Sequence, residues 1–352
     1  MKVMVAMSGG VDSSVAAALL VEAGHEVVGV TMRLWGGESD TGCCSVSDVD
    51  DARRVAQQLG IDHLVFNFTD DFDHHVVQPY VHAHAVGVTP NPCIECNRHV
   101  KFRRLSERAE LLGFDAVATG HHARIGQSGA GRELERGADR AKDQSYVVHM
   151  ISRDELDRTL FPVGSMTKTD VRAHAERLGL RTAAKPDSQD VCFITSTGGR
   201  TAFLGARIPF RPGLVVDTEG SQVGTVPAVE MVTLGQRRGI GLPGGGPKQY
   251  VVGVDVATAT VTVGPERDLF VGGESVGEMT WLHDPASVAG CEVLVQCSAH
   301  GTPQPATVEL TDAAGASIRL TWNDPQRRIA PGQSIVLYDQ TDRFVLAGGT
   351  CL

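Results

Sequence analysis

A glycine-rich turn near the start of the chain has the residue types of a phosphate-binding loop. Ser8-Gly9-Gly10-Val11-Asp12-Ser13 lies between an apolar run, 2–7, and an Ala/Leu-rich run, 13–23. Glycines let the backbone turn tightly, and the first turn of a helix offers N–H groups that bind phosphate. Asp12 would repel a phosphate, so its carboxylate predicts a ligand for Mg²⁺. The turn lacks the spacing of the GxxxxGK[ST] and GxGxxG motifs.

Three cysteines form a second candidate for chemistry. Cys93 and Cys96 are a CxxC pair next to Pro92, which favours a loop that ends at the start of a helix. A helix N-terminus lowers the pKa of a thiol and favours the thiolate. Cys192 lies nearly a hundred residues further on, in KPDSQDVCF (185–193), where its apolar neighbours equally suit a buried, inert cysteine.

Positive charge follows the CxxC pair. At a period of 3.6 residues, Lys101, Arg104 and Arg108 share one helix face, which would stabilise a thiolate and attract a phosphodiester backbone. The competing interpretation is an ordinary solvated face. The same two interpretations hold for the pairs Arg237-Arg238 and Arg327-Arg328.

A zinc site is not predicted, because zinc takes four ligands and no second CxxC or suitably spaced histidine pair accompanies Cys93 and Cys96. The remaining cysteines are interpreted as structural; they are Cys43, Cys44, Cys291, Cys297 and Cys351.

The elements that must position these residues change character along the chain. Strand and helix patterns alternate over the first 125 residues, which predicts a doubly wound parallel sheet. After residue 200, short Val/Thr-rich runs separated by Gly and Pro predict small β-rich units, the last of them a β-barrel. We expect three domains: an α/β domain at 1–200, a central β-rich domain at 201–270 and a β-barrel domain at 271–352.

Composition excludes several classes of protein. The chain has 352 residues, of which 42% are hydrophobic and 21% charged, and this excludes disorder as the main state. No apolar run is long enough to span a membrane, and the net charge of -10 argues against a non-specific nucleic-acid coat. With no secretory signal, eight cysteines indicate cytosolic thiols, so we expect a cytoplasmic protein with no membrane partner.

The SGGVDS turn resembles that of the PP-loop ATP pyrophosphatases, which bind ATP, release pyrophosphate and leave AMP on the substrate. The resemblance implies that Met32 lies at the adenine and that Gly120, in ATGHHAR (118–124), is a further contact. The ATP contacts implied in this way are Ala6, Met7, Ser8, Gly9, Gly10, Val11, Asp12, Ser13, Met32 and Gly120.

Along its whole length the chain resembles one family, the tRNA-specific 2-thiouridylases. The matching motifs include CCSVSDVDDARRVA (43–56), NPCIECNRHVKF (91–102), FPVGSMTKTDVRAHAERLGL (161–180), KPDSQDVCF (185–193) and LGQRRGIGLPGG (234–245). The resemblance implies that ATP adenylates the C2 oxygen of uridine 34, the wobble base of certain tRNAs. A persulfide sulfur then replaces this oxygen, and a cysteine desulfurase or sulfur-relay protein supplies the sulfur.

The same resemblance assigns residues to that reaction. Cys192 matches the persulfide carrier and Cys96 the second catalytic cysteine, which would form a disulfide with Cys192 as sulfur leaves. Residues matching the segment that meets the target base are Asn91, Pro92 and Cys93. Residues matching tRNA contacts are His121, Lys142, Asp143, Gln144 and Gln333.

One departure from the family leaves a second mechanism open. Many members carry Asp where this chain has Cys93, and a thiol is a poorer general acid or base unless its pKa is shifted. Three thiols, Cys93, Cys96 and Cys192, could instead hold a [4Fe-4S] cluster with one open iron that carries sulfur. Two different functions also stay open for the chain: a PP-loop ligase acting on a small molecule, and a non-catalytic module that binds tRNA or relays sulfur.

Overall fold

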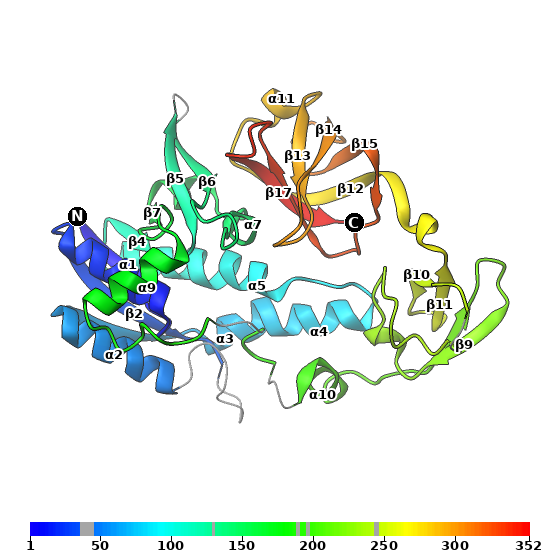
Figure 1. Cartoon of the computed structure of the whole chain (residues 1–352), viewed down its shortest axis with the longest axis horizontal. Coiled ribbons are helices and arrows are strands. Elements are labelled where there is room, and N and C mark those ends of the chain that lie inside the picture. The colour runs from blue at the N-terminus through cyan, green and yellow to red at the C-terminus, as the bar shows by residue number, and fades with distance from the viewer. Residues whose placement is uncertain (36–45, 129–130, 188–190, 195–197, 243–245) are drawn as a thin grey trace.

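A parallel sheet, a smaller mixed sheet and a closed barrel follow one another along the chain (Figure 1). The computed structural model describes all residues except 36–45, 129–130, 188–190, 195–197 and 243–245. Cys43 and Cys44, which the sequence assigns a structural role, lie outside the described residues. The predicted fold class is confirmed.

The amino-terminal sheet has the strand order β3-β2-β1-β4-β7, with every neighbouring pair parallel. Its strands are β1 (Lys2–Ala6), β2 (Glu26–Arg33), β3 (Asp62–Asn67), β4 (Ala116–Ala118) and β7 (Thr159–Leu160). From β1 the chain winds outward to β2 and β3, and later returns to the other side of β1 through β4. The crevice at the carboxyl ends of β1 and β4 is therefore the place where a doubly wound sheet binds its ligand.

Helices cover both faces of this sheet. One face packs against α1 (Val11–Glu22), α2 (Val46–Leu59) and α9 (Lys168–Arg177) through an apolar cluster rich in Val and Ala. The other face packs on two long helices. The first comprises α3 (Thr69–Phe72), a π-helical segment η1 (Asp73–Val77) and α4 (Gln78–Ala85).

The second long helix starts earlier than the sequence predicts. It comprises α5 (Pro92–Glu95), a π-helical segment η2 (Cys96–Arg104) and α6 (Leu105–Leu111). The sequence predicts that the CxxC pair lies in a loop that precedes the helix. Proline at the first helical position is compatible with a helix start, and the Asn91 side chain caps the helix by accepting from the N–H of Cys93 at 3.1 Å.

Two β-rich parts follow. The mixed sheet has the order β10-β11-β8-β9, and its strands are β8 (Gly213–Val216), β9 (Gln222–Val226), β10 (Tyr250–Asp255) and β11 (Thr260–Gly264). The barrel closes in the order β12-β15-β14-β13-β16-β17. Its strands are β12 (Phe270–Trp281), β13 (Glu292–Gln296), β14 (Gln304–Leu310), β15 (Ile318–Arg327), β16 (Ser334–Tyr338) and β17 (Val345–Cys351).

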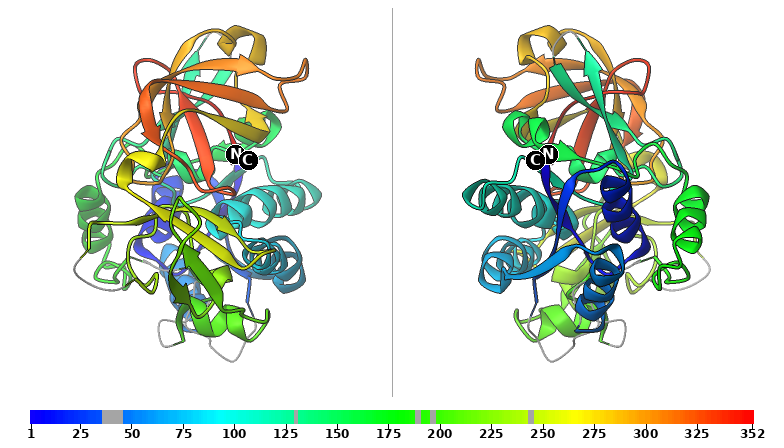
Figure 2. Two further views of the ribbon diagram at one scale, coloured as in Figure 1. Left: turned by 90° about the vertical axis from the view of Figure 1, so that its right-hand side faces the viewer. Right: turned by 90° about the vertical axis from the view of Figure 1, so that its left-hand side faces the viewer.

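A hairpin that the sequence did not reveal joins the sheet to the barrel. Its strands, β5 (Ala123–Ser128) and β6 (Gly131–Arg136), rise beside the barrel (Figures 1 and 2). The hairpin, the helix α7 (Ser145–Val148) and the barrel share one apolar cluster that includes Leu134, Tyr146 and Tyr338. The remaining short helices are α8 (Arg153–Asp157), α10 (Gly199–Gly205) and α11 (Pro285–Val288).

Candidate active site

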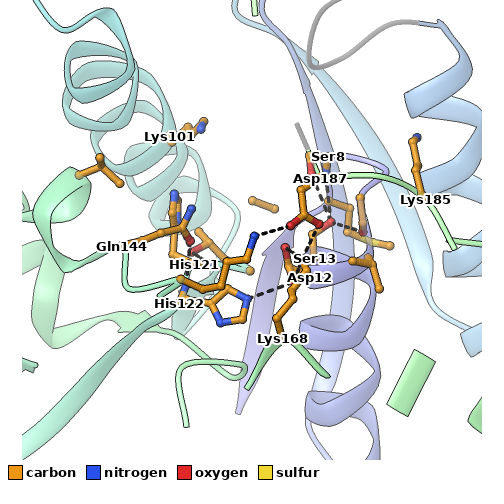
Figure 3. A pocket seen from close by; sticks show the side chains of 18 of the residues that line it. Ser8, Asp12, Ser13, Lys101, His121, His122, Gln144, Lys168, Lys185 and Asp187 are labelled. Atoms are coloured by element: carbon orange, nitrogen blue, oxygen red, sulfur yellow. Dashed lines mark hydrogen bonds and ion pairs between the residues drawn. The ribbon is translucent and has the colours of Figure 1, made fainter. Parts of the chain in front are cut away.

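A cavity of about 600 Å³ opens where the carboxyl ends of β1 and β4 meet helix α1 (Figure 3). Most of the predicted ATP contacts line it: Ala6, Met7, Ser8, Gly10, Val11, Asp12, Ser13, Met32 and Gly120. Four of the predicted tRNA contacts also line it: His121, Lys142, Asp143 and Gln144. Residues from two separate predicted sets therefore line the same cavity.

The glycine loop is held in a shape that only small residues allow. Gly9 has φ +74°, and a Cβ placed there would lie 2.4 Å from the Asp48 carbonyl oxygen. Gly120 comes equally close to the start of α1, with a Cβ position 2.6 Å from the Ser13 nitrogen. Gly10, the N-cap of α1, gives the helix no side-chain cap. The loop thus brings backbone N–H groups and the positive end of the α1 dipole to the cavity.

Two lysines on the other walls of the cavity are not among the predicted site residues. Lys168 begins α9, and its Nζ lies 2.7 Å from both carboxylate oxygens of Asp12. Lys185 donates from Nζ to the Gly9 carbonyl at 2.9 Å and to the Asp48 carboxylate at 2.6 Å. Lys168 lies in the motif at 161–180 and Lys185 in the motif at 185–193. Both motifs carry the family resemblance, so the sequence contained a signal for both lysines.

Asp12 is an ion-paired carboxylate in this structure. Besides Lys168 it contacts His122, whose Nε2 lies 3.1 Å from its Oδ1. Burial raises the pKa of Asp12, but the hydrogen bonds with His122 and Lys168 outweigh this effect and leave the pKa below its usual value. Asp12 is therefore ionised at neutral pH, with both oxygens bound by protein donors.

Asp187 is the second ionised carboxylate of the cavity. It accepts from Lys142 at 2.9 Å, lies 2.8 Å from Lys168 and pairs with Arg172 at 2.9 Å. Burial raises the pKa of Asp187, whereas the hydrogen bonds from Lys168 and Lys142 lower it to about 2. Figure 3 shows Lys168 reaching between the carboxylates of Asp12 and Asp187.

The side of the cavity formed after β4 is less charged. Burial lowers the pKa of His121 to about 3, so its imidazole is neutral, and its Nδ1 lies 2.7 Å from the Thr119 hydroxyl. The Gln144 side chain accepts from the N–H of His122 at 2.8 Å. Asp143 is turned towards Arg136, with which it forms an ion pair of 2.8 Å. A flat, uncharged group would find mainly neutral donors and acceptors here.

Cys96 and Cys192, nearly a hundred residues apart, meet at one apolar cluster. Cys96 is buried within it, and the half-buried Cys192 packs against it. Ala6 and Met32 belong to the same cluster and also line the cavity. The apolar cluster that contains Cys96 and contacts Cys192 thus also contributes to the lining of the cavity. Neither Cys96 nor Cys192 is among the described residues that line the cavity.

Phe193 anchors the Cys192 segment in that cluster. Its ring lies 5.6 Å from the ring of Phe72, 5.5 Å from Tyr80 and 5.1 Å from Phe203, measured between centroids. Phe193 is 3% exposed. Because Cys192 precedes this anchor directly, its position is tied to the core on which Cys96 lies.

The predicted target-base segment lies outside the cavity. Cys93 is exposed, whereas Pro92 is buried. Gln333, from the barrel, donates to the Thr89 carbonyl, and the N–H of Thr89 donates to the Pro331 carbonyl at 3.0 Å. Gln333 thus holds the loop in front of α5 against the barrel.

The prediction of one basic helix face after the CxxC pair is wrong. Lys101 lines the cavity, whereas Arg104 pairs with Asp71 at 2.9 Å and with Glu107 at 2.7 Å. The guanidinium of Arg108 lies over the Phe66 ring. The period of 3.6 residues does not hold over Cys96–Arg104, where the helix is π-wound, so residues that share a face in an α-helix diverge here.

The three thiols do not fit an iron–sulfur cluster in this arrangement. Among the described residues, no three His, Cys, Asp or Glu side chains are placed to hold a metal ion together. Cys93 is exposed at the start of α5, while Cys96 is buried in the apolar cluster. Cys297 and Cys351 fit the structural role that the sequence assigns them, because burial raises the pKa of each thiol to about 12, whereas Cys291 is exposed.

A doubly wound sheet with a glycine loop at its switch point and lysines around it defines a nucleotide-binding protein of the PP-loop class. Family models agree with this: "tRNA methyl transferase HUP domain" matches residues 1–196, "tRNA methyl transferase PRC-barrel domain" 201–265 and "Aminomethyltransferase beta-barrel domain" 274–351. The chain belongs to the family of tRNA-specific 2-thiouridylases called MnmA.

Relatives of that name match nearly end to end. The MnmA of Mycobacteroides abscessus is 48% identical over 96% of this chain and 95% of its own length. The MnmA of Chloroflexus aurantiacus is 45% identical over 99% of this chain and 97% of its own length. A solved 4-thiouridine synthetase in complex with RNA and ATP covers 55% of this chain and 44% of its own, with 21% identity and a TM-score of 0.37. None of the described helices is long and apolar enough to cross a bilayer.

Proposed function

We propose that this protein thiolates the wobble uridine of tRNA at C2, in a reaction driven by ATP. The observation that carries the proposal is the apolar cluster shared by Cys96, Cys192 and the wall of the glycine-loop cavity. A ligase acting on a small molecule needs no such pair of cysteines behind its nucleotide site. The names of the full-length relatives support the same reaction.

ATP would lie with its adenine against Met32 and its phosphates at the glycine loop. Met32 and Leu34 provide the apolar part of the lining, and Lys168 and Lys185 lie near the loop. The uridine C2 oxygen attacks the α-phosphate, pyrophosphate leaves, and the base carries AMP. Adenylation converts an oxygen that leaves poorly into a phosphate ester that leaves readily. The neutral side of the cavity, with His121 and Gln144, suits an extruded base.

Sulfur would arrive as a persulfide on Cys192, loaded by a cysteine desulfurase or a sulfur-relay protein. The Cys96 thiolate attacks the Cys192 sulfur and displaces hydrosulfide, and a Cys96–Cys192 disulfide forms. Hydrosulfide then attacks C2, and AMP leaves with the former uridine oxygen. A thiol reductant returns both cysteines to the reduced state. Their common position on one apolar cluster supports this pairing.

Mg²⁺ accompanies ATP as part of the substrate rather than as a resident ion. Both oxygens of Asp12, the predicted ligand, are bound by Lys168, and the described residues provide no group of three metal-binding side chains. We therefore assign no catalytic step to a metal held by the protein.

The test separates activation from sulfur transfer. Purified protein is incubated with ATP, a wobble-uridine tRNA transcript and a persulfide donor, and both pyrophosphate and 2-thiouridine are measured. Cys192→Ser should release pyrophosphate in the presence of tRNA but yield no 2-thiouridine. Cys291→Ser, which changes an exposed cysteine of the barrel, should behave as the wild type. Pyrophosphate release without tRNA, or wild-type thiolation by Cys192→Ser, would refute the proposal.

A further inference from the structure

The lysine at the centre of the cavity has no donor left for a ligand. An ammonium group has three N–H donors. The three nearest acceptors of Lys168 are the two oxygens of Asp12, at 2.7 Å each, and Oδ1 of Asp187, at 2.8 Å. The side chain of Lys168 is only 12% exposed, so water does not supply alternative partners freely.

Asp187 also forms ion pairs with two further cations on this side of the cavity. Its Oδ2 binds Lys142 at 2.9 Å, and its Oδ1 binds Arg172 at 2.9 Å in addition to Lys168. Four lysines and four aspartates line the cavity, so their formal charges cancel. A polyphosphate needs uncompensated cations, and in this arrangement carboxylates already pair with Lys142, Lys168 and Lys185.

We propose that Asp187 is a positioning residue that competes with the polyphosphate of ATP for Lys168 and Lys142, and that ATP binding displaces it. This inference rests on the proposed binding of ATP to the cavity. The carboxylate keeps the two lysines in place in the absence of nucleotide and yields them to the phosphates when ATP enters. Asp187 therefore lowers the affinity for ATP while it preserves the geometry of the site.

Asp187, rather than Asp12, is the carboxylate able to move. Asp12 lies in the first turn of α1 and is fixed by the helix backbone. Asp187 lies in a stretch without regular secondary structure, and its side chain is 22% exposed. The alternative is that Asp187 stays in place and helps to hold the Mg²⁺ that accompanies ATP. The two possibilities predict opposite effects of removing its charge.

The decisive variant is Asp187→Asn, which keeps the size of the side chain and removes its charge. The dissociation constants of a non-hydrolysable ATP analogue with Mg²⁺, of pyrophosphate alone and of adenosine alone are measured by calorimetry. We expect the dissociation constants of the ATP analogue and of pyrophosphate to fall about tenfold. In the variant, the lysines no longer have to break an ion pair with residue 187 before they bind phosphate. The constant for adenosine should not change, because adenosine carries no phosphate. A general loss of structure in the site would not lower the dissociation constant of pyrophosphate while leaving that of adenosine unchanged.

Glu22→Gln provides the matched control. Glu22 pairs with Arg177 at 2.8 Å, and neither residue is among the described residues that line the cavity. Its removal should leave all three constants unchanged. A constant for the ATP analogue that is unchanged or higher in Asp187→Asn, and also in Asp187→Ser, overturns the proposal. Thiolation is not measured here, so failure of this inference is distinguishable from failure of the proposed reaction.

Discussion

The Lys168 side chain links the glycine loop to α9, a helix in which no site residue was predicted. It lies at the amino end of α9, yet its ammonium group contacts Asp12 at the beginning of α1. Any anion that enters between these helices meets Lys168. We therefore predict that Lys168 contacts the phosphates of ATP.

Lys168→Gln should weaken binding of the ATP analogue by about ten- to a hundredfold, because hydrogen bonds to charged groups contribute roughly 1.5–3 kcal/mol. The measurement is calorimetric titration of the variant and the wild type. Lys2→Gln serves as the control, since Lys2 lies over the Phe114 ring, away from the cavity. Equal affinities of Lys168→Gln and wild type would exclude Lys168 from the phosphate site.

The helix that carries Lys168 is set by its first residues. Thr167 caps α9 through a reciprocal arrangement in which Thr167 accepts from the N–H of Asp170, and Asp170 accepts from the N–H of Thr167. This capping box fixes where the helix begins and hence where Lys168 emerges from it. A Thr followed three residues later by an acidic residue is a local signal for such a cap.

Thr167→Ala should cost about 1 kcal/mol of unfolding free energy, the typical loss for a helix N-cap, and should raise the KM for ATP several-fold through the displaced lysine. Thr167→Ser should restore both values, because serine caps a helix equally well. Urea unfolding and initial rates at varied ATP concentrations provide the measurements. A raised KM in Thr167→Ser as well would argue against the cap as its cause.

Local signals of this kind explain which parts were predictable. The glycine loop and the parallel strands follow from short patterns, and the structure confirms both. The start of the helix at Pro92 was missed because its first turns contain few apolar residues in a period of 3.6. The hairpin β5–β6 was missed because four of the six residues of β6 are charged, although its last four residues are buried in the structure.

The cavity was predictable, but its ion pairs were not. Asp12 was predicted as a ligand of Mg²⁺ because a carboxylate repels phosphate. Its lysine partner comes from 156 positions further along the chain, and no local pattern reveals such a contact. The meeting of Cys96 and Cys192 was likewise implied only by the family resemblance. Long-range contacts are set by the topology of the sheet rather than by spacing in the sequence.

The barrel is joined to the sheet domain by a buried charged contact. Arg136, from β6, binds Asp143 at 2.8 Å, Gln296 at 2.7 Å and Asp342 at 2.7 Å, and its guanidinium lies 3.5 Å from the Tyr338 ring centroid. Gln296, Tyr338 and Asp342 lie in the barrel or in its loops. One arginine thus connects the loop that carries the cavity residues 142–144 to the carboxyl-terminal part of the chain.

Arg136→Met should destabilise the protein by about 3 kcal/mol or more, because it leaves the Asp143 carboxylate buried without its partner. Arg140→Met is the control, since Arg140 also pairs with Asp342 but is 53% exposed, and exposed pairs contribute about 1 kcal/mol or less. Thermal and urea unfolding measure both. Equal losses in the two variants would show that the buried contact contributes no more than a surface pair.

The last prediction concerns the stability of the protein in acid. Burial lowers the pKa of His121 to about 3 and the pKa values of His84 and His149 to about 4, against about 6.5 in an unfolded chain. Below pH 6.5 the unfolded chain therefore takes up protons that the folded chain excludes. The free energy of unfolding should fall as the pH drops from 6.5 to 5, by about 1.4 kcal/mol per pH unit for each such histidine.

This window isolates the histidines, because carboxylates with a lowered pKa affect stability only as the pH approaches about 4 and below. Urea unfolding at pH 7.5, 6.5, 5.8 and 5.0 measures the slope. His149→Gln removes one titrating group between the sheet domain and the barrel. The dependence of its unfolding free energy on pH should therefore be smaller by about 1.4 kcal/mol per pH unit, the contribution of one proton. A free energy of unfolding that stays constant from pH 7.5 to 5.0 would mean that these three imidazoles accept protons without opening the fold.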